Sequence, residues 1–489
     1  MTFREDDDIP ARLDRLPWSR WHWRIVLALG VAWVLDGLEI TLVGAIAAVL
    51  QRPDALALDA AEVGWTGSLY VAGAVIGALV FGRLADRLGR KRLFLLTLTV
   101  YTTATLASAF AFDFGLFVLT RFVTGLGIGG EYAAINSAIV ELIPARLRGR
   151  VNLAINGSFW FGAALGAAAS LVLLDLFGPR DGWRAAFAAG GLLAIAIVLV
   201  RRHVPESPRW LMWHGHEAEA RRVVAHIEAE VAARHGALPP PVATPGLRSR
   251  ADADPTPSLG TVARALFGRY RQRSLVALAL MLSQAFFYNA VFFTYALVLT
   301  RFHRVEETKV GLYVLPFALA NVLGPLLLGP LFDRFGRRPM IGLTYVLSAL
   351  GLGLTGWAFA EGWLDARSQT LCWSAVFFIA SAAAGSAYLT ASEVFPLEMR
   401  SLAIAVFYAI GTGASGFVAP ALFGALIETG SRGAVAGGYA IGAALMLLAG
   451  LGAWRYAIAA EHRPLEEIAQ PLDERAPDAV TTEVRHSSG

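Results

Sequence analysis

The sequence predicts an all-α membrane protein with twelve transmembrane helices in two pseudo-symmetric six-helix bundles, and three observations support this fold class. The chain of 489 residues is 56% hydrophobic and only 16% charged, and its mean hydropathy of +0.54 exceeds that of an ordinary water-soluble domain. Twelve apolar stretches are each long enough for the roughly 20 residues that a spanning helix needs. Two motifs of the first half return at equivalent positions in the second half.

The twelve stretches divide evenly between the halves. They begin near Ile25, Val63, Leu93, Gly115, Val151 and Ala185, and then near Leu275, Val310, Met340, Thr370, Leu402 and Val435. The predicted organisation is a cytoplasmic N-terminal segment (1–24), a bundle (25–200), a cytoplasmic linker (201–272), a second bundle (273–458) and a charged, disordered cytoplasmic tail (459–489). Within the linker, residues 216–235 have the spacing of an amphipathic helix.

The charge distribution predicts that both termini are cytoplasmic. Short loops on the side of the N-terminus carry more Lys and Arg than those on the other side, and the basic N-terminus and Arg-rich linker fall on the same face. The N-terminus lacks the apolar core and cleavage site of a secretory signal. Nearly all basic residues are arginine, which is typical of a GC-rich genome and favours a bacterial inner membrane.

Composition argues against several functional classes. The single cysteine, Cys372, excludes an internal disulfide and a cysteine-based metal site. We find no nucleotide loop, metal cluster or nucleophile–base arrangement, so we expect no enzyme, no catalytic residue, no metal and no cofactor. The net charge of +4 does not argue for nucleic-acid binding. The expected partners of this chain, which we expect to be a monomer, are the lipid bilayer, a small-molecule solute and a proton.

A charged motif recurs in the two halves, as FGRLADRLGRKR (81–92) and GPLFDRFGRRP (329–339). We expect Asp86 to bond the N-terminus of the eleventh helix and to pair with Arg90 or Arg148. In the second half we expect Asp333 to act in the same way with Arg337 and Arg400. A second repeated pair, ELIPARLRG and EVFPLEMRS, follows the fourth and tenth stretches. The residues expected at this cytoplasmic gate are Asp86, Arg90, Glu141, Arg148, Asp333, Arg337, Glu393 and Arg400.

Over about residues 33–455 the chain resembles the major facilitator superfamily, of which GRLADRLGRKR is the signature. The E-x-x-P-x-x-x-R-G form (141–149) and VPESPRWL (204–211) are similar to the sugar-porter branch. The first stretch, LDGLEITLVG, carries two acids and is similar to organic-acid and aromatic-acid/proton symporters and to synaptic-vesicle-protein-like relatives. The resemblance implies secondary transport by alternating access and leaves the branch open.

The residues expected to couple proton movement are Asp36, Glu39, Arg121 and Glu131. Asp36 and Glu39 are three apart and share one face of an apolar helix. At about 1.5 Å per residue, Glu39 and Arg121 both fall in the middle third of the bilayer, so they can meet. A carboxylate released from arginine into an apolar cavity takes up a proton, so the pair predicts a proton switch. Glu131 is either a coupling residue or a structural partner of a gate arginine.

The resemblance also indicates substrate contacts. The segment SQAFFYNAVFFTYA is similar to the seventh span of sugar porters, with Gln284 and Asn289 at matching spacing. Elsewhere this chain has fewer hydrogen-bonding residues than sugar porters, and unpaired sugar hydroxyls are costly to bury. Aromatic residues replace them. The expected substrate-binding residues are Asn156, Trp160, Gln284, Tyr288, Asn289 and Tyr388.

We therefore expect a proton-coupled symporter that takes up a small organic solute. An organic or aromatic acid is favoured slightly over a sugar, because Arg121 can neutralise a carboxylate while Asp36 and Glu39 are protonated. The alternatives are a sugar:proton symporter, a passive facilitator, which the acids of the first span argue against, and a non-transporting, transporter-like receptor.

Overall fold

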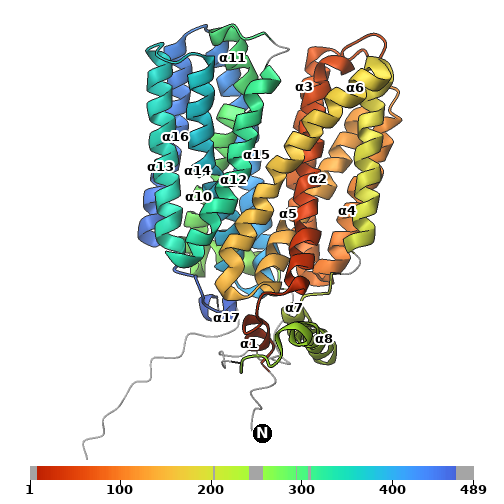
Figure 1. Cartoon of the computed structure of the whole chain (residues 1–489), viewed down its shortest axis with the longest axis vertical. Coiled ribbons are helices and arrows are strands. Elements are labelled where there is room, and N and C mark those ends of the chain that lie inside the picture. The colour runs from red at the N-terminus through yellow and green to blue at the C-terminus, as the bar shows by residue number, and fades with distance from the viewer. Residues whose placement is uncertain (1–7, 202–203, 242–256, 293, 307–309, 470–489) are drawn as a thin grey trace, which may run out of the picture.

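The computed structural model describes residues 8–201, 204–241, 257–292, 294–306 and 310–469. Within these ranges the regular secondary structure is helical, and two bundles of long helices stand side by side (Figure 1). They meet at the end that carries α1, α7, α8 and α17, and they diverge toward the other end.

The first bundle consists of α2 (Arg20–Leu50), α3 (Ala60–Leu88), α4 (Arg90–Ala109), α5 (Phe114–Leu142) and α6 (Arg148–Arg201). α6 contains two of the predicted crossings, because its helical path is broken at Gly178 and followed by Pro179. Gly178 has a φ of 71°, which favours glycine, and a proline within a helix removes a backbone hydrogen bond. The bundle therefore crosses six times.

The second bundle consists of α10 (Arg271–Phe292), α11 (Tyr295–His303), α12 (Val310–Arg334), α13 (Arg337–Ala360), α14 (Ala366–Glu393), α15 (Arg400–Glu428) and α16 (Arg432–Tyr456). α10, which ends at Phe292, and α11, which begins at Tyr295, together make the seventh crossing. The remaining five helices cross once each, so the predicted twelve-helix fold is confirmed.

Nine helical segments of the described ranges are long and apolar enough to span a membrane, and one of them, Ala145–Ile195, holds both crossings of α6. The two long bundle helices outside this set are α4 and α5. α5 carries Arg121 and Glu131 within its length, and charged residues lower its mean hydropathy. Charged side chains inside a membrane span are costly and need partners.

Short helices gather where the bundles meet. They are α1 (Ile9–Asp14), α7 (Pro208–Trp213), α8 (Glu217–His235), α9 (Leu259–Arg264) with a π turn at Ala265–Arg269, and α17 (Leu465–Ile468). This end also carries the repeated basic motifs, so it is the cytoplasmic end. α8 covers the amphipathic stretch expected at 216–235, and the buried residues of its inner face include Val224 and Ile227.

The structure differs from the expected disordered tail at residues 459–469. The carboxylate of Glu461 accepts a hydrogen bond of 3.0 Å from the backbone N–H of Arg337, and α17 is ordered by an ion pair of Glu466 (described below). The charges of this segment are therefore used in contacts with the bundles. Residues 470–489 of the expected tail lie outside the described residues.

Glycines allow α3 and α5 to approach closely. A Cβ atom added at Gly129 of α5 would lie 1.9 Å from the carbonyl oxygen of Ala74 in α3, and one added at Gly125 would lie 2.1 Å from that of Tyr70. Small residues have this role at many membrane helix contacts. This contact packs the part of α5 that follows Arg121 directly against α3.

We predict that Gly129→Ala lowers the melting temperature of the detergent-purified protein, because the added methyl group must push α3 and α5 apart. Overpacking of this kind costs about 1–3 kcal/mol. The matched control is Gly437→Ala in α16, where an added Cβ meets no atom within 4 Å. Equal melting temperatures for the two variants would contradict the close-approach account.

Candidate functional site

A cavity of about 580 Å³ lies between the two bundles, a volume suited to a small organic ligand. Residues of α2, α3, α5 and α6 line it from one bundle and residues of α10, α14 and α15 from the other. It extends to Leu50 and Val63, near the outer ends of α2 and α3. All six residues expected to contact substrate line it, namely Asn156, Trp160, Gln284, Tyr288, Asn289 and Tyr388, and so does Arg121.

Apolar surface dominates the cavity wall, and several of its hydrogen-bonding side chains are already engaged. Asn156 donates from Nδ2 to the side-chain oxygens of Asn152, at 3.1 Å, and Asn136, at 3.3 Å. Its own Oδ1 is buried without a partner among the described residues. The hydroxyl of Tyr288 donates to Asn321 at 2.7 Å. These engaged groups are less available to a polyhydroxylated solute, whereas Asn156 keeps a buried acceptor and Tyr70 a buried hydroxyl.

Aromatic rings form much of the cavity wall, including three that sequence reasoning missed. Ring centroids lie 4.7 Å apart for Trp33 and Tyr132, 4.6 Å for Tyr132 and Tyr408, and 5.6 Å for Trp33 and Tyr388. These four residues come from α2, α5, α15 and α14, so both bundles contribute. Trp33 could have been found from its position three residues before Asp36 on one helix face. Nothing local in the sequence indicates that Tyr408 faces the cavity.

On another part of the wall, Trp160 stacks on Tyr288 with 5.7 Å between centroids and a 30° interplanar angle. Phe292 meets Trp160 edge-on at 5.0 Å. Offset and edge-to-face arrangements are the favourable ones for aromatic pairs. The wall therefore presents ring faces and edges that suit a flat aromatic solute.

The structure brings Glu39 and Arg121 into direct contact. Arg121 donates from Nη1 to Glu39 and from Nη2 to Thr124 at 3.1 Å, and both charged side chains are fully buried. The Thr105 hydroxyl lies 3.4 Å from the same oxygen of Glu39. The guanidinium also lies 4.4 Å from the centroid of the Phe187 ring. This is a buried ion pair that borders the cavity through its arginine.

Asp36 and Glu131 are buried but do not belong to this pair. Asp36 lies one turn below Glu39 on α2 and is close enough to Tyr132 and Tyr388 for an electrostatic interaction with each. Glu131 is ten residues from Arg121 on α5, which is about 15 Å along the helix. The two acids are thus set at different depths from Glu39.

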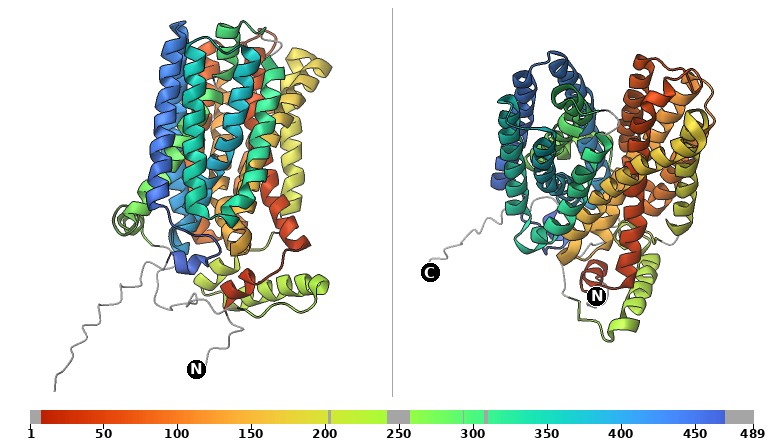
Figure 2. Two further views of the ribbon diagram at one scale, coloured as in Figure 1. Left: turned by 60° about the vertical axis from the view of Figure 1, so that its left-hand side comes forward. Right: turned by 45° about the horizontal axis from the view of Figure 1, so that its top comes forward.

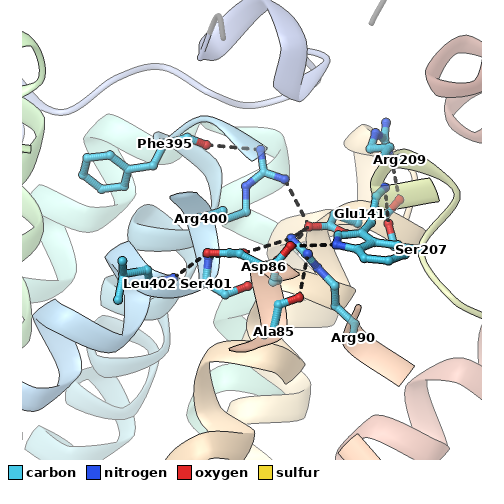
Figure 3. A network of polar contacts seen from close by, with 12 residues as sticks. Ala85, Asp86, Arg90, Glu141, Ser207, Arg209, Phe395, Arg400, Ser401 and Leu402 are labelled. Atoms are coloured by element: carbon cyan, nitrogen blue, oxygen red, sulfur yellow. Dashed lines mark hydrogen bonds and ion pairs between the residues drawn. The ribbon is translucent and has the colours of Figure 1, made fainter. Parts of the chain in front are cut away.

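The first half of the expected cytoplasmic gate closes across the bundles (Figure 3). Asp86, at the end of α3, accepts hydrogen bonds from the backbone N–H groups of Ser401 at 3.3 Å and Leu402 at 3.1 Å, at the start of α15. Arg90 lies 3.4 Å from Asp86 and 2.8 Å from Glu141. A carboxylate at a helix N-terminus is stabilised by the helix dipole and by the free N–H groups there.

The second half repeats this arrangement in the opposite direction. Asp333, at the end of α12, accepts from the backbone N–H groups of Gly149 at 3.0 Å and Arg150 at 2.9 Å, at the start of α6. Arg337 lies 2.9 Å from Asp333 and 3.0 Å from Glu393. Each bundle therefore caps a helix of the other, and the cytoplasmic side is closed.

Asp86 pairs with Arg90, one of the two arginines expected for it. Arg148, the alternative partner, lies 3.1 Å from Asp14 of α1. Arg400, expected beside Asp333, instead lies 3.4 Å from Glu141, across the interface. The expectation assigned each arginine to an aspartate of the repeated motif. The structure supplies other acids, one of which belongs to a segment outside the repeat.

Sequence reasoning also missed the residues that attach the cytoplasmic segments to this gate. Arg209 of the linker lies 3.2 Å from Asp14 and 2.9 Å from Glu466 of α17. Burial alone would raise the pKa of Glu466, but nearby Arg209 brings that pKa below its usual value. Glu206 accepts from the backbone N–H of Arg90 at 2.8 Å, and its burial raises its pKa. The N-terminal segment, linker and tail thus converge on the closed gate.

No group of three or more His, Cys, Asp or Glu residues that could hold a metal ion occurs within the described ranges. The site consists of an aromatic cavity, one buried ion pair and a closed gate. This geometry suits binding and passage of a solute.

Comparison with known proteins finds similarity over most of the chain. The family profile described as Sugar (and other) transporter matches residues 23–472. The niacin transporter NiaP of Acinetobacter baylyi is 30% identical over 408 residues, which cover 83% of this chain and 87% of that relative. The 4-hydroxybenzoate transporter PcaK of Pseudomonas aeruginosa is 29% identical over 429 residues, with coverage of 86% and 89%. A gallate transporter of Pseudomonas putida is 28% identical over 426 residues, with coverage of 86% and 88%.

Solved structures share the fold. The proton:xylose symporter XylE bound to 6-bromo-6-deoxy-D-glucose aligns with a TM-score of 0.72 at 20% identity, covering 91% of this chain and 98% of XylE. An inward-open structure of XylE from E. coli aligns with a TM-score of 0.59 at 21% identity, with coverage of 91% and 98%. The twelve-helix architecture is therefore that of the major facilitator superfamily.

We predict that Asp86→Asn opens the cytoplasmic side, because the neutral side chain is a weaker cap for α15. A cysteine engineered at Leu153, which is fully buried in α6 and adjoins Gly385 of α14, reports the opening in a Cys372→Ser background. Labelling from the cytoplasmic side should become about fivefold faster, as expected for roughly 1 kcal/mol at a helix terminus.

The control is Asp113→Asn, which removes a charged cap within one bundle, since Asp113 accepts from Leu116 of its own helix. It should leave the labelling rate at Leu153→Cys unchanged. If Asp86→Asn also leaves the rate unchanged, the motif has no part in closing the gate.

Proposed function

The chain belongs to the Sugar (and other) transporter family, and from this premise we propose that it takes up a small aromatic carboxylic acid together with a proton. The protein is a multi-pass membrane transporter and not an enzyme. The observation that carries the proposal is the position of Arg121, which lines an aromatic cavity while it is paired with buried Glu39. We propose that its guanidinium attracts the solute carboxylate.

The cavity wall supports an aromatic solute. Trp33, Tyr132, Trp160 and Tyr288 present rings to the cavity. Polar side chains such as Asn156 and Tyr288 already make hydrogen bonds within the protein. Niacin, 4-hydroxybenzoate and gallate, named for three relatives, are all aromatic carboxylates. A planar ring gains stacking contacts here without leaving many hydroxyl groups unpaired.

Proton coupling follows from competition for one cation. An incoming carboxylate shares or takes the guanidinium of Arg121, and Glu39, which is fully buried, then lacks full neutralisation. Under those conditions a carboxylate binds a proton. The anion and the proton then cross together, and Asp36, one turn away, offers a second protonation site.

The arrangement of the gate supports alternating access. The cavity extends toward the outer ends of α2 and α3, while Asp86 and Asp333 hold the cytoplasmic side closed. This is an outward-facing state, ready for uptake. Transport requires these contacts to break after the solute has bound.

A sugar is the second candidate solute. Gln284 and Asn289 line the cavity at the spacing typical of sugar porters, and their amides can bond hydroxyl groups. The solute panel described below separates the two candidates.

We predict that proteoliposomes alkalinise the external medium when nicotinate, 4-hydroxybenzoate or gallate is added, and do so much less with xylose or glucose. Arg121→Ala should remove the response to the acids, because no cation remains to receive the carboxylate. Alkalinisation by sugars alone would overturn the aromatic-acid assignment. If a folded sample showed no alkalinisation with any solute, a non-transporting receptor would be favoured.

We predict that Glu39→Gln abolishes accumulation driven by a proton gradient but preserves exchange of labelled solute between equal pools. The amide cannot carry the proton, yet it leaves the cavity wall intact. The control, Glu361→Gln, changes an exposed acid beyond the end of α13 and should accumulate normally. Wild-type accumulation by Glu39→Gln would exclude Glu39 as the coupling residue.

A further inference from the structure

A second cavity of about 590 Å³ lies on the outer side of the second bundle, away from the solute cavity. The first turns of α10 and the last turns of α16 form its walls, at the cytoplasmic ends of both helices. We call it the α10–α16 groove. α9 and the π turn that follows it (residues 259–269, green in Figure 2) project from the side of the second bundle next to this groove.

The deep part of this groove is a narrow apolar slot. Its walls contain Ala279 from α10 and Ala449, Gly452 and Ala453 from α16, whose small side chains leave room between the helices. Leu275 and Leu448 border the groove and are 56% and 67% exposed. In a spanning bundle such outward-facing leucines contact lipid, so the slot is open to the acyl chains of the bilayer.

The cytoplasmic rim of the groove is basic. Arg269, Arg271 and Gln272 line it, and its described lining contains no acidic residue. Glu467, which lines the adjoining cavity, lies 3.6 Å from Arg463. Arg273, which also borders that cavity, donates to the backbone carbonyls of Val394 and Ile468. The described rim of the groove therefore presents arginine side chains and no carboxylate.

Aromatic residues place this rim at the level of the lipid headgroups. Tyr456 lines the groove and is 51% exposed, and Phe267 is 59% exposed on the projecting turn. Trp454, at the same level on another face of α16, is 46% exposed. Exposed Trp and Tyr residues concentrate at membrane–water interfaces. The arginines lie where phosphates of the cytoplasmic leaflet lie, and the slot begins just inside the hydrocarbon.

We propose that the α10–α16 groove binds an anionic glycerophospholipid, with its phosphate headgroup at Arg269 and Arg271 and one acyl chain in the slot. Basic pockets between helices on the cytoplasmic side have the chemistry to bind such headgroups. The inference does not depend on the identity of the transported solute. It predicts a lipid that remains bound after purification and stabilises the chain.

The headgroup is tested with the full chain in phosphatidylcholine nanodiscs with and without dioleoylphosphatidylglycerol, by native mass spectrometry and melting temperature. Wild type should retain phosphatidylglycerol and melt higher in its presence. The double variant Arg269→Gln/Arg271→Gln should bind it roughly 25-fold more weakly, at about fivefold for each arginine. Arg455→Gln, at the same level but outside the groove lining, should retain it.

The acyl chain is tested by filling the slot without touching the arginines. A Cβ added at Gly452 or at Gly437 meets no atom within 4 Å, so a side chain can start from either position of α16 without a backbone clash. Gly452→Leu should release the lipid, whereas Gly437→Leu, near the outer end of α16, should keep it.

Three results would overturn the proposal. They are equal retention of phosphatidylcholine and phosphatidylglycerol by the wild type, equal loss of phosphatidylglycerol from Arg455→Gln and the double variant, and equal stabilisation of lipid-free protein by inorganic phosphate. The last result would mean that the rim binds a free anion and the slot binds nothing.

Discussion

A charge inside a membrane must have a partner, and this constraint governs the rest of the structure. Removing one member of a buried pair leaves an uncompensated charge in a medium of low dielectric constant, at a cost of several kcal/mol. Arg121 therefore holds Glu39, and Arg90 and Arg337 hold Glu141 and Glu393. Because each pair joins different helices, each also specifies how those helices are placed.

The same constraint explains why the gate is reciprocal. The carboxylates of Asp86 and Asp333 each face the unpaired N–H groups at the start of a helix in the opposite bundle. Neither bundle can move away at the cytoplasmic end without exposing both a carboxylate and a helix terminus. The contacts of the repeated motif thus close the cavity between the bundles on the cytoplasmic side. On the other side the cavity extends toward the outer ends of α2 and α3.

Much of this arrangement could be predicted because it depends on local patterns. Hydropathy predicts twelve crossings, and the repeat predicts that Asp86 reaches the eleventh helix. Depth along helices predicts that Glu39 meets Arg121. The partners of Arg148 and Arg400 could not be predicted in this way, since they depend on how unrelated segments pack. Tyr132 and Tyr408 likewise meet because the two bundles pack against each other, and the residue spacing within either helix does not indicate this contact.

Infrared difference spectroscopy of the reconstituted protein tests the central claim most directly, namely that an aromatic carboxylate entering the cavity causes Glu39 to bind a proton. Addition of a transported acid at constant pH should produce the C=O stretching band of a protonated carboxyl group in the wild type, and Glu39→Gln should lack it. A band of equal intensity in Glu39→Gln, or no band in a wild type that transports the acid, would contradict the account.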